Sequence, residues 1–433
     1  MSINKKVAFY TLGCKVNQYE TEIIKKDFVV NGYEEVKFED NADVYVINTC
    51  TVTSIADKKN KKMLRRAKKT NPEAVVIATG CYAQTNIEDL KKLEEVDFII
   101  GNVKKENVYE IFSKNLSNYQ VDNIFDEKEY TSTKYTILRD KARAFVKIQD
   151  GCNKFCSYCK IPYARGLSRS RKPEEVLEEI RFLGESGYKE VVLTGINLSE
   201  YGLDLEPSIT FDYILEEVLK IEKIERVRVS SVYPDTLSEK FIYLLKTNKK
   251  LMPHLHVSIQ SLDDKILSLM KRKYNAEFVV ELLMRIQKEI PEIAITADLI
   301  VGFPQEEEEN FLNTYENIKK ISFSDFHLFP YSDREKTAAA QLSGKVDQKT
   351  KKDRVKYLEK LKEEKFLEFR KKSLNTIQKV YIEEIKLDKA YGYTENYLKV
   401  ELEAENHKVM DVIDVKIVSV YDDLLKGETV WKK

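Results

Sequence analysis

Several features that often assign a sequence to a class are missing here. The 433 residues carry 72 Lys and Arg against 72 Asp and Glu, so the net charge is zero and gives no indication of a nucleic-acid partner. No apolar run has the roughly 20 residues that a membrane-spanning helix needs. Residues 1–7 lead directly into an apolar run and do not resemble a signal peptide, so we expect a cytoplasmic protein with no membrane partner.

Cysteine is scarce as well, and its distribution is more informative than its number. The six cysteines form two sets of three, Cys14, Cys50 and Cys81 in one part of the chain, and Cys152, Cys156 and Cys159 in another. Disulfide bonds would be the usual explanation in a secreted protein, whereas two sets of three suit metal clusters in a reducing compartment better. A chain of 433 residues is long enough for two or three domains with separate cores.

The second set lies in one loop, residues 151–166, with the spacing CxxxCxxC, directly after the apolar run 144–148. Three thiolates can hold a 4Fe–4S cluster and leave its fourth iron open to bind something else. Lys154, Lys160 and Arg165 flank the cysteines and would favour their thiolate forms. The alternative is a zinc site, but structural zinc usually takes four ligands and no fourth ligand lies nearby in the sequence. The loop therefore predicts a catalytic iron–sulfur cluster.

The first set follows a pattern that occurs three times. Apolar runs at 7–12, 44–49 and 74–79 each end within two residues of a cysteine, and a helix-like stretch follows each. Strands that alternate with helices form a parallel sheet, whose strand ends share the edge where α/β proteins bind ligands. A single buried cysteine is usually a packing residue. Three cysteines at three strand ends predict a second cluster, for which Gly13 and Gly80 leave room.

Further apolar runs, each followed by a helix-like stretch, predict a partial barrel in the middle of the chain. They lie at 190–194, 227–230, 255–259, 295–301 and 326–329, and the strand before Cys152 completes six βα units. In barrels of parallel strands the chemistry lies where the strands end. Polar residues and glycines stand at these ends, at 194–197, 230–231, 258–261, 298 and 302–304, although each alone could be a turn or cap residue.

The last part of the chain changes character. A long charged helix is expected from about residue 345, and alternating runs at 379–383, 397–401 and 415–418 predict a small β-barrel. The fold class is therefore α/β. We expect an N-terminal parallel α/β sheet in residues 1–115, a partial (βα)6 barrel in residues 138–370 and a C-terminal antiparallel β-barrel in residues 371–433. Residues 114–136 are polar and poor in aliphatic side chains, as expected of a linker.

Three basic segments are candidates for contacts with nucleic-acid phosphates. They are residues 58–69, the group Arg165, Arg169, Arg171 and Lys172, and residues 271–273. Neutralised phosphates add salt-dependent affinity, but a charge run is also typical of a solvated helix face or loop. His254, His256 and His327 lie in or beside expected strands, and we interpret them as core groups without a catalytic role.

The string GCNKFCSYCKIPYARG, residues 151–166, resembles the signature of the radical S-adenosylmethionine (SAM) enzymes and, among them, of the methylthiotransferases. The resemblance implies that Cys152, Cys156 and Cys159 hold a catalytic 4Fe–4S cluster. SAM would chelate its open iron, and one electron from the cluster would cleave SAM to a 5′-deoxyadenosyl radical. The resemblance also implies that Tyr158 packs near the adenine of SAM. The positions that hold SAM and the substrate in the family match Thr194, Gly195, Asn197, Gln260 and Asp298.

The chain departs from the pattern of that family at a few positions near the expected mouth of the barrel. The family usually has isoleucine where Lys160 stands and glycine where Leu262 and Gln305 stand. Proline-glycine is common where this chain has Glu335-Lys336. None of these departures touches a cysteine.

The strings around the first cysteine set resemble the N-terminal methylthiotransferase domain. They are GCKVNQYETE at 13–22, NTCTVT at 48–53 and TGCYAQ at 79–84. In that domain Cys14, Cys50 and Cys81 would hold a second 4Fe–4S cluster, which is implicated in sulfur delivery. GCKVNQYETE resembles the MtaB-type branch, which acts on N6-threonylcarbamoyladenosine in tRNA. The string GYTENY at 392–397 resembles the TRAM domain of tRNA-modifying enzymes.

The resemblance implies an enzyme that converts N6-threonylcarbamoyladenosine next to the tRNA anticodon to its 2-methylthio derivative. Its partners would be the anticodon stem-loop of tRNA and an electron donor such as a flavodoxin or ferredoxin. An external sulfur donor is the alternative to sulfur from the second cluster. Two other functions stay open: the same chemistry on isopentenyladenosine or on a ribosomal protein, and a non-catalytic, zinc-stabilised RNA-binding protein.

Overall fold

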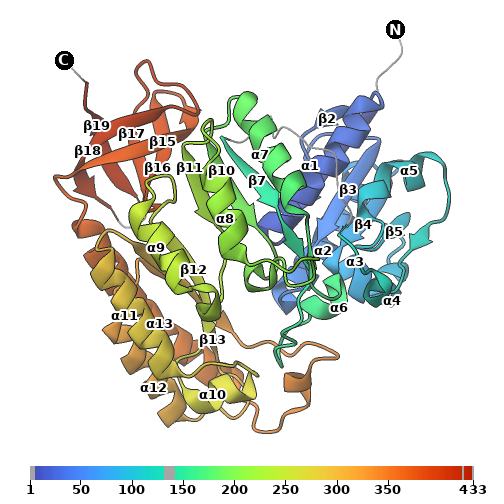
Figure 1. Ribbon diagram of the computed structural model, residues 1–433. Helices are drawn as coiled ribbons and strands as arrows, with labels where there is room; N and C mark the ends of the chain where they lie inside the picture. The colour runs from blue at the N-terminus through green and yellow to red at the C-terminus, as the bar shows by residue number, and fades with distance from the viewer. Residues whose placement is uncertain (1–4, 131–141, 422–423, 432–433) are drawn as a thin grey trace.

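Three parts of the chain pack into one body in the computed structural model, which describes residues 5–130, 142–421 and 424–431. A parallel sheet flanked by helices is followed by an open ring of strands and by a small closed barrel at the C-terminal end (Figure 1). The predicted start of the middle domain at residue 138 lies outside the described residues. The division into domains at 1–115, 138–370 and 371–433 stays a prediction.

The N-terminal sheet has six parallel strands in the order β2-β1-β3-β4-β5-β6. The three predicted apolar runs are β1, β3 and β4, which are neighbours in the sheet. Strand β6 extends the sheet into the segment expected as a linker. The strands are β1 (Lys6–Thr11), β2 (Glu34–Val36), β3 (Val44–Thr49), β4 (Val75–Gly80), β5 (Phe98–Ile100) and β6 (Tyr119–Gln120). The helices are α1 (Lys15–Val30), α2 (Ser54–Thr70), α3 (Cys81–Thr85), α4 (Ile87–Lys91) and α5 (Val108–Ser113).

Alternation along the strands explains why both faces of this sheet are covered. Successive strand residues point to opposite faces, so a strand that is apolar throughout needs a packing layer on each side. Tyr45 and Ile47 of β3 pack in the core that contains Leu64 of α2. Val44 and Val46 of the same strand pack in the core that contains Phe28 of α1.

The middle of the chain forms the predicted partial barrel of six βα units. Two sheets, β11-β10-β7 and β12-β13-β14, are joined by the parallel bridges Val227 to Leu251 and Val232 to Val257. Among the described strands β7 and β14 are not paired, so the ring is open between them. The strands are β7 (Arg143–Lys147), β10 (Glu190–Thr194), β11 (Arg226–Val229), β12 (His254–Gln260), β13 (Ala294–Val301) and β14 (Asp325–Pro330). The outer helices are α7 (Pro173–Glu185), α8 (Phe211–Leu219), α9 (Glu239–Thr247), α11 (Ala276–Glu289) and α12 (Glu308–Lys320).

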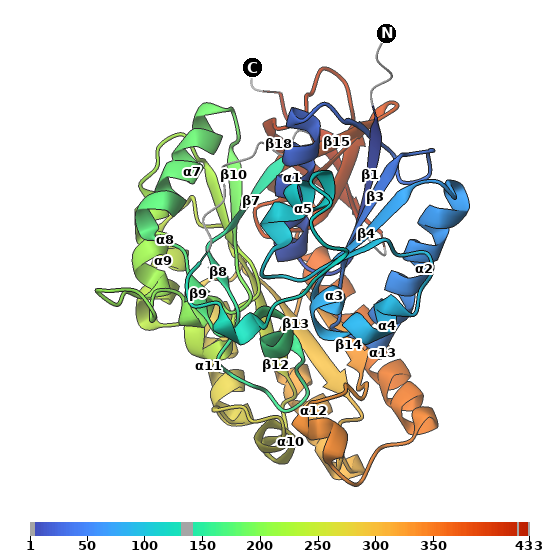
Figure 2. The same cartoon turned by 90° about the vertical axis from the view of Figure 1, so that its right-hand side faces the viewer.

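Shorter elements decorate the ends of the barrel strands. They are β8 (Gln149–Asp150), β9 (Arg169–Ser170), α6 (Ile161–Arg165) and α10 (Asp264–Leu269). The N-terminal sheet lies beside the open side of the ring (Figure 2). Helix α1 contacts β7, and Arg334, in the loop after β14, donates a hydrogen bond to the Thr51 carbonyl at 2.8 Å. The sheet therefore covers the gap between the first and last barrel strands.

The C-terminal barrel follows a long helix, α13 (Gln348–Lys371), and closes in the order β15-β16-β17-β19-β18. Its strands are β15 (Ile377–Lys386), β16 (Lys389–Thr394), β17 (Lys399–Glu403), β18 (Val412–Val420) and β19 (Leu425–Thr429). The prediction of an antiparallel barrel is correct except for one pairing, because β17 and β19 are parallel. A closed ring with an odd number of strands cannot alternate direction throughout, so one parallel pair is unavoidable. None of the described helices is long and apolar enough to cross a bilayer.

Candidate functional site

The three cysteines of the first set meet at one edge of the N-terminal sheet. Cys50 and Cys81 directly follow β3 and β4, and Cys14 is the third residue after β1. Gly13 allows this approach, since a Cβ on it would lie 3.0 Å from Cys50 Sγ. Burial, and next the charge of Cys81, raise the pKa of Cys50 to about 12. Thiolates are unfavourable in such a buried group of cysteines unless a cation compensates their charge. Shared metal ions supply that charge, so the arrangement is consistent with a cluster.

The second set lies in the loop that leads from β8 to α6. Backbone N–H groups of Lys154 and Ile161 point at sulfur, 3.5 Å from Cys152 Sγ and 3.4 Å from Cys159 Sγ. The Asn197 amide donates to Cys152 Sγ at 3.6 Å. Hydrogen bonds to the sulfurs are a recurrent feature of iron–sulfur sites and tune their potential. Burial raises the pKa of both Cys152 and Cys159 to about 12.

Neither cysteine set is arranged for a single zinc ion. Within residues 5–130, 142–421 and 424–431, the one group of three metal-binding side chains whose ligand atoms lie within 4.8 Å of one another is His256, Asp298 and His327. Tetrahedral zinc with bonds of about 2.3 Å would bring its sulfurs to about 3.8 Å from one another. The wider spacing of the sulfurs suits a cluster with several irons.

A cavity of about 920 Å³ extends from the first cysteine set across the ends of the barrel strands to the C-terminal barrel. All three parts of the fold contribute to its wall. Cys14 and Lys15 come from the N-terminal part, Thr194, Gly195, Ser230 and Asp298 from the partial barrel, and Tyr393, Asn396, Tyr397 and Lys399 from the C-terminal barrel. The Ser230 hydroxyl is buried without a hydrogen-bond partner in the described part of the chain, as expected of a wall that awaits a polar ligand.

The predicted cofactor residues fall at three places around this cavity. Thr194, Gly195 and Asp298 line it. Asn197 lies against Cys152, as described above. Gln260 ends β12 at an irregularity in the strand pairing and has a φ of +69°, a strained value for a residue other than glycine that is often found at functional sites.

Tyr158 lies within the second cysteine loop, between Cys156 and Cys159, and its hydroxyl accepts a hydrogen bond from Arg272 Nη2 at 2.8 Å. Arg272 also stacks over Tyr233, with 4.5 Å from the guanidinium carbon to the ring centre. Burial raises the pKa of Cys159, and the positive charge of Arg272 opposes this larger effect only in part. Arg272 Nε and Nη1 are buried and have no partner among the described residues, so they suit an anionic group beside the second cysteine set. In the sequence Arg272 is only one residue of the basic segment 271–273, and no local pattern indicates this position.

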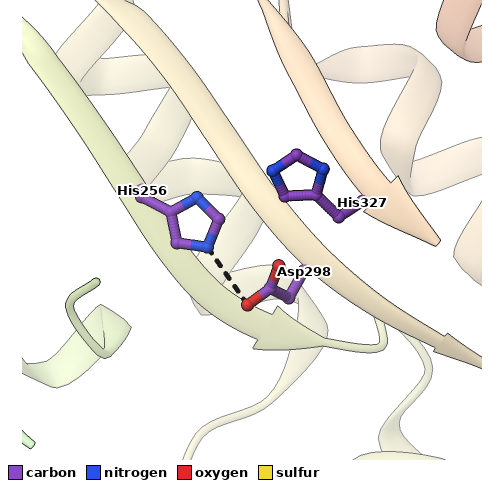
Figure 3. A group of neighbouring side chains, drawn as sticks. All are labelled: His256, Asp298 and His327. Carbon is purple, nitrogen blue, oxygen red and sulfur yellow. Dashed lines mark ion pairs between the residues drawn. The ribbon is translucent and has the colours of Figure 1, made fainter. Parts of the chain in front are cut away.

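The three histidines are not simple core groups, contrary to our interpretation from the sequence. Figure 3 shows His256, Asp298 and His327 on the neighbouring strands β12, β13 and β14, with their side chains turned toward one another. His256 Nε2 lies 3.1 Å from Asp298 Oδ2, and its Nδ1 lies 2.8 Å from the Thr296 hydroxyl. These three side chains, together with His254, line the cavity. The alternation of His254 and His256 along one strand was the available signal, because such residues share a face.

The expected phosphate contacts of Arg165, Arg169 and Arg171 are wrong. These side chains are buried, with exposed fractions of 1%, 6% and 0%. Arg171 pairs with Glu179, and Arg165 pairs with Asp150 at 3.0 Å and with Glu20 at 2.8 Å. Charged side chains are rarely buried unless they are paired, and each of these arginines has a carboxylate partner, since Arg169 lies 3.9 Å from Asp150.

Arg165 also acts on the other cysteine set. Its charge lowers the pKa of Cys14, against the larger effect of burial, and the charge of Cys81 raises the pKa of Arg165. Lys154 and Lys160, which flank the second set in sequence, instead bond to Asp235 and Asn86, at 2.6 and 2.7 Å. A cation from the second cysteine loop therefore compensates charge at the first cysteine set.

Two positions where the chain lacks the family's glycine keep a glycine-like backbone. Gln305 has a φ of +66° and Lys336 a φ of +65°, in the left-handed region that side chains disfavour. The loops at the mouth of the barrel therefore keep a glycine-like backbone here at the cost of local strain.

Comparison with known proteins agrees with this geometry. Residues 6–101 match the family described as "Uncharacterized protein family UPF0004", and residues 146–318 match the radical SAM superfamily. Among solved structures, the radical SAM methyltransferase TsrM from Kitasatospora setae shares the fold, with a TM-score of 0.56 at 14% identity over 78% of this chain and 75% of that one.

Three curated relatives match over nearly their whole length. Threonylcarbamoyladenosine tRNA methylthiotransferase MtaB is 43% identical in Aquifex aeolicus, over 92% of this chain and 97% of the relative. The Bacillus subtilis MtaB is 40% identical, over 98% and 96%. The tRNA-2-methylthio-N(6)-dimethylallyladenosine synthase of Clostridium tetani is 35% identical, over 99% and 97%. The chain is therefore an enzyme that belongs to the radical SAM methylthiotransferase family, with the MtaB-type proteins among its relatives.

Proposed function

We propose that this enzyme replaces the C2 hydrogen of N6-threonylcarbamoyladenosine, next to the anticodon of tRNA, with a methylthio group. The observation that carries the proposal is the cavity beside the first cysteine set, whose wall includes Lys15, His256, Asp298 and His327. Two relatives that are named for this nucleoside in tRNA have 40% and 43% identity, against 35% for the Clostridium tetani relative that is named for dimethylallyladenosine.

The chemistry of the wall favours the threonylcarbamoyl substituent over the isopentenyl one. A threonylcarbamoyl group carries a carboxylate, a hydroxyl and a urea-like linkage, all of which need hydrogen-bond or charge partners when they leave water. Asp298 and the two histidines beside it offer such partners. An isopentenyl group is a hydrocarbon and can form no hydrogen bond or ion pair with these side chains.

Radical SAM methylthiotransferases use SAM and two 4Fe–4S clusters. On this proposal Cys152, Cys156 and Cys159 hold the cluster that binds SAM, and Cys14, Cys50 and Cys81 hold the other. When bound, these groups supply the radical and the sulfur that an unactivated C2–H bond requires, because acids and bases cannot remove that hydrogen. Tyr158, Thr194, Gly195, Asn197, Gln260 and Asp298 would contact SAM or the substrate.

The remaining partners follow from the same proposal. The tRNA anticodon stem-loop supplies the nucleoside, and a flavodoxin or ferredoxin supplies electrons. An external sulfur donor is the alternative to sulfur from the second cluster. One basic surface is available for the RNA, the exposed face of α2. The C-terminal barrel, which resembles a TRAM domain, is a second candidate for contacts with the RNA.

The test is mass spectrometry of nucleosides after anaerobic incubation of the reconstituted enzyme with SAM, a reductant and sulfide. One tRNA carries N6-threonylcarbamoyladenosine and a second carries isopentenyladenosine. We expect a methylthio group on the first nucleoside only. Modification of the second alone would overturn the substrate assignment, and SAM cleavage without modification of either would leave only the radical chemistry.

A further inference from the structure

Lys15 is a cation without a counter-ion on the wall of the cavity. It directly follows Cys14, is half-buried and lines the cavity. No hydrogen bond or ion pair of its ammonium group is found within the described part of the chain. A half-buried ammonium without a partner is costly, because it has lost part of its hydration and gained nothing in exchange.

The groups around Lys15 add positive charge and offer no free carboxylate. Arg143 and Arg228 act on it electrostatically, and the acid that acts on it, Glu190, is shared by Arg226 at 2.6 Å, Arg228 at 2.8 Å and Arg143 at 3.8 Å. The two acids that line the cavity are occupied as well. Asp298 faces His256 at 3.1 Å, and Asp325 pairs with Lys362 at 3.0 Å.

The local sequence does not explain a lysine at this position. Lys15 is the first residue of α1, and the first turn of that helix holds no acidic residue. The partial positive charge of a helix N-terminus disfavours a cation there. A residue that conflicts with its helix, its neighbours and its solvation is a candidate for a role in binding.

We propose that Lys15 is the carboxylate receptor of the cavity and binds the carboxylate of the threonyl substituent. This inference rests on the proposed function and deepens it, since it names the group that recognises the substrate. An ammonium–carboxylate bond in a partly desolvated site is a strong, charge-assisted contact. It gives the cavity a reason to prefer an acidic N6 substituent over a neutral one.

The position of Lys15 agrees with the geometry of the nucleoside. In adenine, C2 and the carbon that carries N6 are separated by a single ring atom, N1. The group that carries sulfur to C2 and the group that holds the N6 substituent therefore have to lie close together. Cys14 and Lys15 are adjacent in the chain and line the same cavity, which meets this requirement.

The experiment compares two anticodon stem-loop RNAs, one with N6-threonylcarbamoyladenosine and one with its neutral methyl ester. Binding to the holoenzyme is measured by fluorescence anisotropy, and methylthiolation by mass spectrometry. The variants are Lys15→Met, which removes the charge, and Lys15→Arg, which keeps it. Lys37→Met is the matched control, because Lys37 is exposed in the same N-terminal part and does not line the cavity.

We expect the wild type, Lys15→Arg and Lys37→Met to bind the acid about tenfold more tightly than the ester, and Lys15→Met to bind both equally. Iron content and the thermal midpoint show whether Lys15→Met is folded and loaded. If Lys15→Met still binds the acid more tightly than the ester, Lys15 is not the carboxylate receptor. The same holds if the wild type binds the acid and the ester equally. If the wild type prefers the acid but methylthiolates neither RNA, the proposed function fails while the receptor stands.

Discussion

Arg165 holds both carboxylate oxygens of Glu20, with Nη1 to Oε1 at 2.8 Å and Nη2 to Oε2 at 2.9 Å. The two residues are 145 positions apart, in α6 of the second cysteine loop and in α1 of the N-terminal part. Glu20 also accepts from Lys105 at 2.6 Å and from Lys147 at 2.8 Å. One buried carboxylate therefore compensates three cations and fixes the position of one cysteine set relative to the other.

Replacing Glu20 with glutamine should destabilise the protein strongly. The change leaves three buried cations with one carboxylate fewer, and breaking a buried ion pair from one side typically costs about 3–5 kcal/mol. The thermal midpoint of the anaerobically purified protein should fall accordingly. Glu22→Gln is the control, because Glu22 pairs with Lys25 near the surface, at 3.4 Å, and its loss should cost about 0.5 kcal/mol. Equal shifts for the two variants would contradict this role of Glu20.

Glu106 should make stability depend on pH near neutrality. Burial raises the pKa of its carboxyl group to about 7 from an ordinary value of 4.5. The folded protein therefore binds more protons than the unfolded chain between pH 4.5 and 7, and its stability falls as the pH rises through this window. Glutamine cannot lose a proton, so the free energy of unfolding of Glu106→Gln should not fall in this window. From pH 4 to pH 8 its stability relative to the wild type should therefore rise by about 2 kcal/mol.

Urea unfolding at several pH values measures this difference. Glu110→Gln is the matched control, because Glu110 is exposed on the same segment. If the unfolding free energies of the wild type and of Glu106→Gln change equally from pH 4 to pH 8, the pKa of Glu106 is not raised in the folded protein.

Substitutions in the two cysteine sets should affect different steps of the reaction. Cys152→Ala should abolish cleavage of SAM to 5′-deoxyadenosine, whereas Cys50→Ala should keep the cleavage and lose methylthiolation. Each variant should retain about four of about eight iron atoms. Chromatography of 5′-deoxyadenosine, iron analysis and nucleoside mass spectrometry measure the three quantities. Equal loss of SAM cleavage in both variants would refute this division.

The exposed face of α2 should contribute to the salt dependence of RNA binding. Lys58, Lys62 and Lys69 are exposed, and Val52, just before this helix, lines the cavity. Each phosphate contact contributes about 0.7–0.9 to the slope of log K against log salt, so changing all three lysines to glutamine should lower the slope by about 2. The same change at the exposed Lys349, Lys352 and Lys356 of α13 is the control. If both triple variants change the slope equally, α2 is not a specific contact surface.

The sequence predicted the elements whose pattern is local. The cysteine-bearing strands and the six barrel strands are apolar runs of the right length, and parallel topology then brings their ends together. Strands β16 and β19 of the C-terminal barrel were not among the runs predicted from the sequence. Strand β19 is short and mixed in character, and its parallel pairing with β17 follows from ring closure, which no local pattern reports.

The parts of the site that escaped prediction depend on partners distant in sequence. Arg165 appeared to be one charge in a basic run, because nothing near it in sequence reveals Glu20. His256, Asp298 and His327 gather through strand register, since Asp298 pairs with His327 and Thr296 pairs with His256. Shifting either strand by one residue would turn one of these side chains to the opposite face.

The cavity wall includes Tyr397 and Lys399, from the last forty residues of the chain, opposite Cys14 near its beginning. Cys14 is synthesised early and Tyr397 and Lys399 late, so the complete cavity forms only after the C-terminal barrel has folded. Both cysteine sets emerge and can be loaded before that moment. An unfinished chain could therefore carry its clusters without possessing the enclosure in which a radical would be directed to RNA.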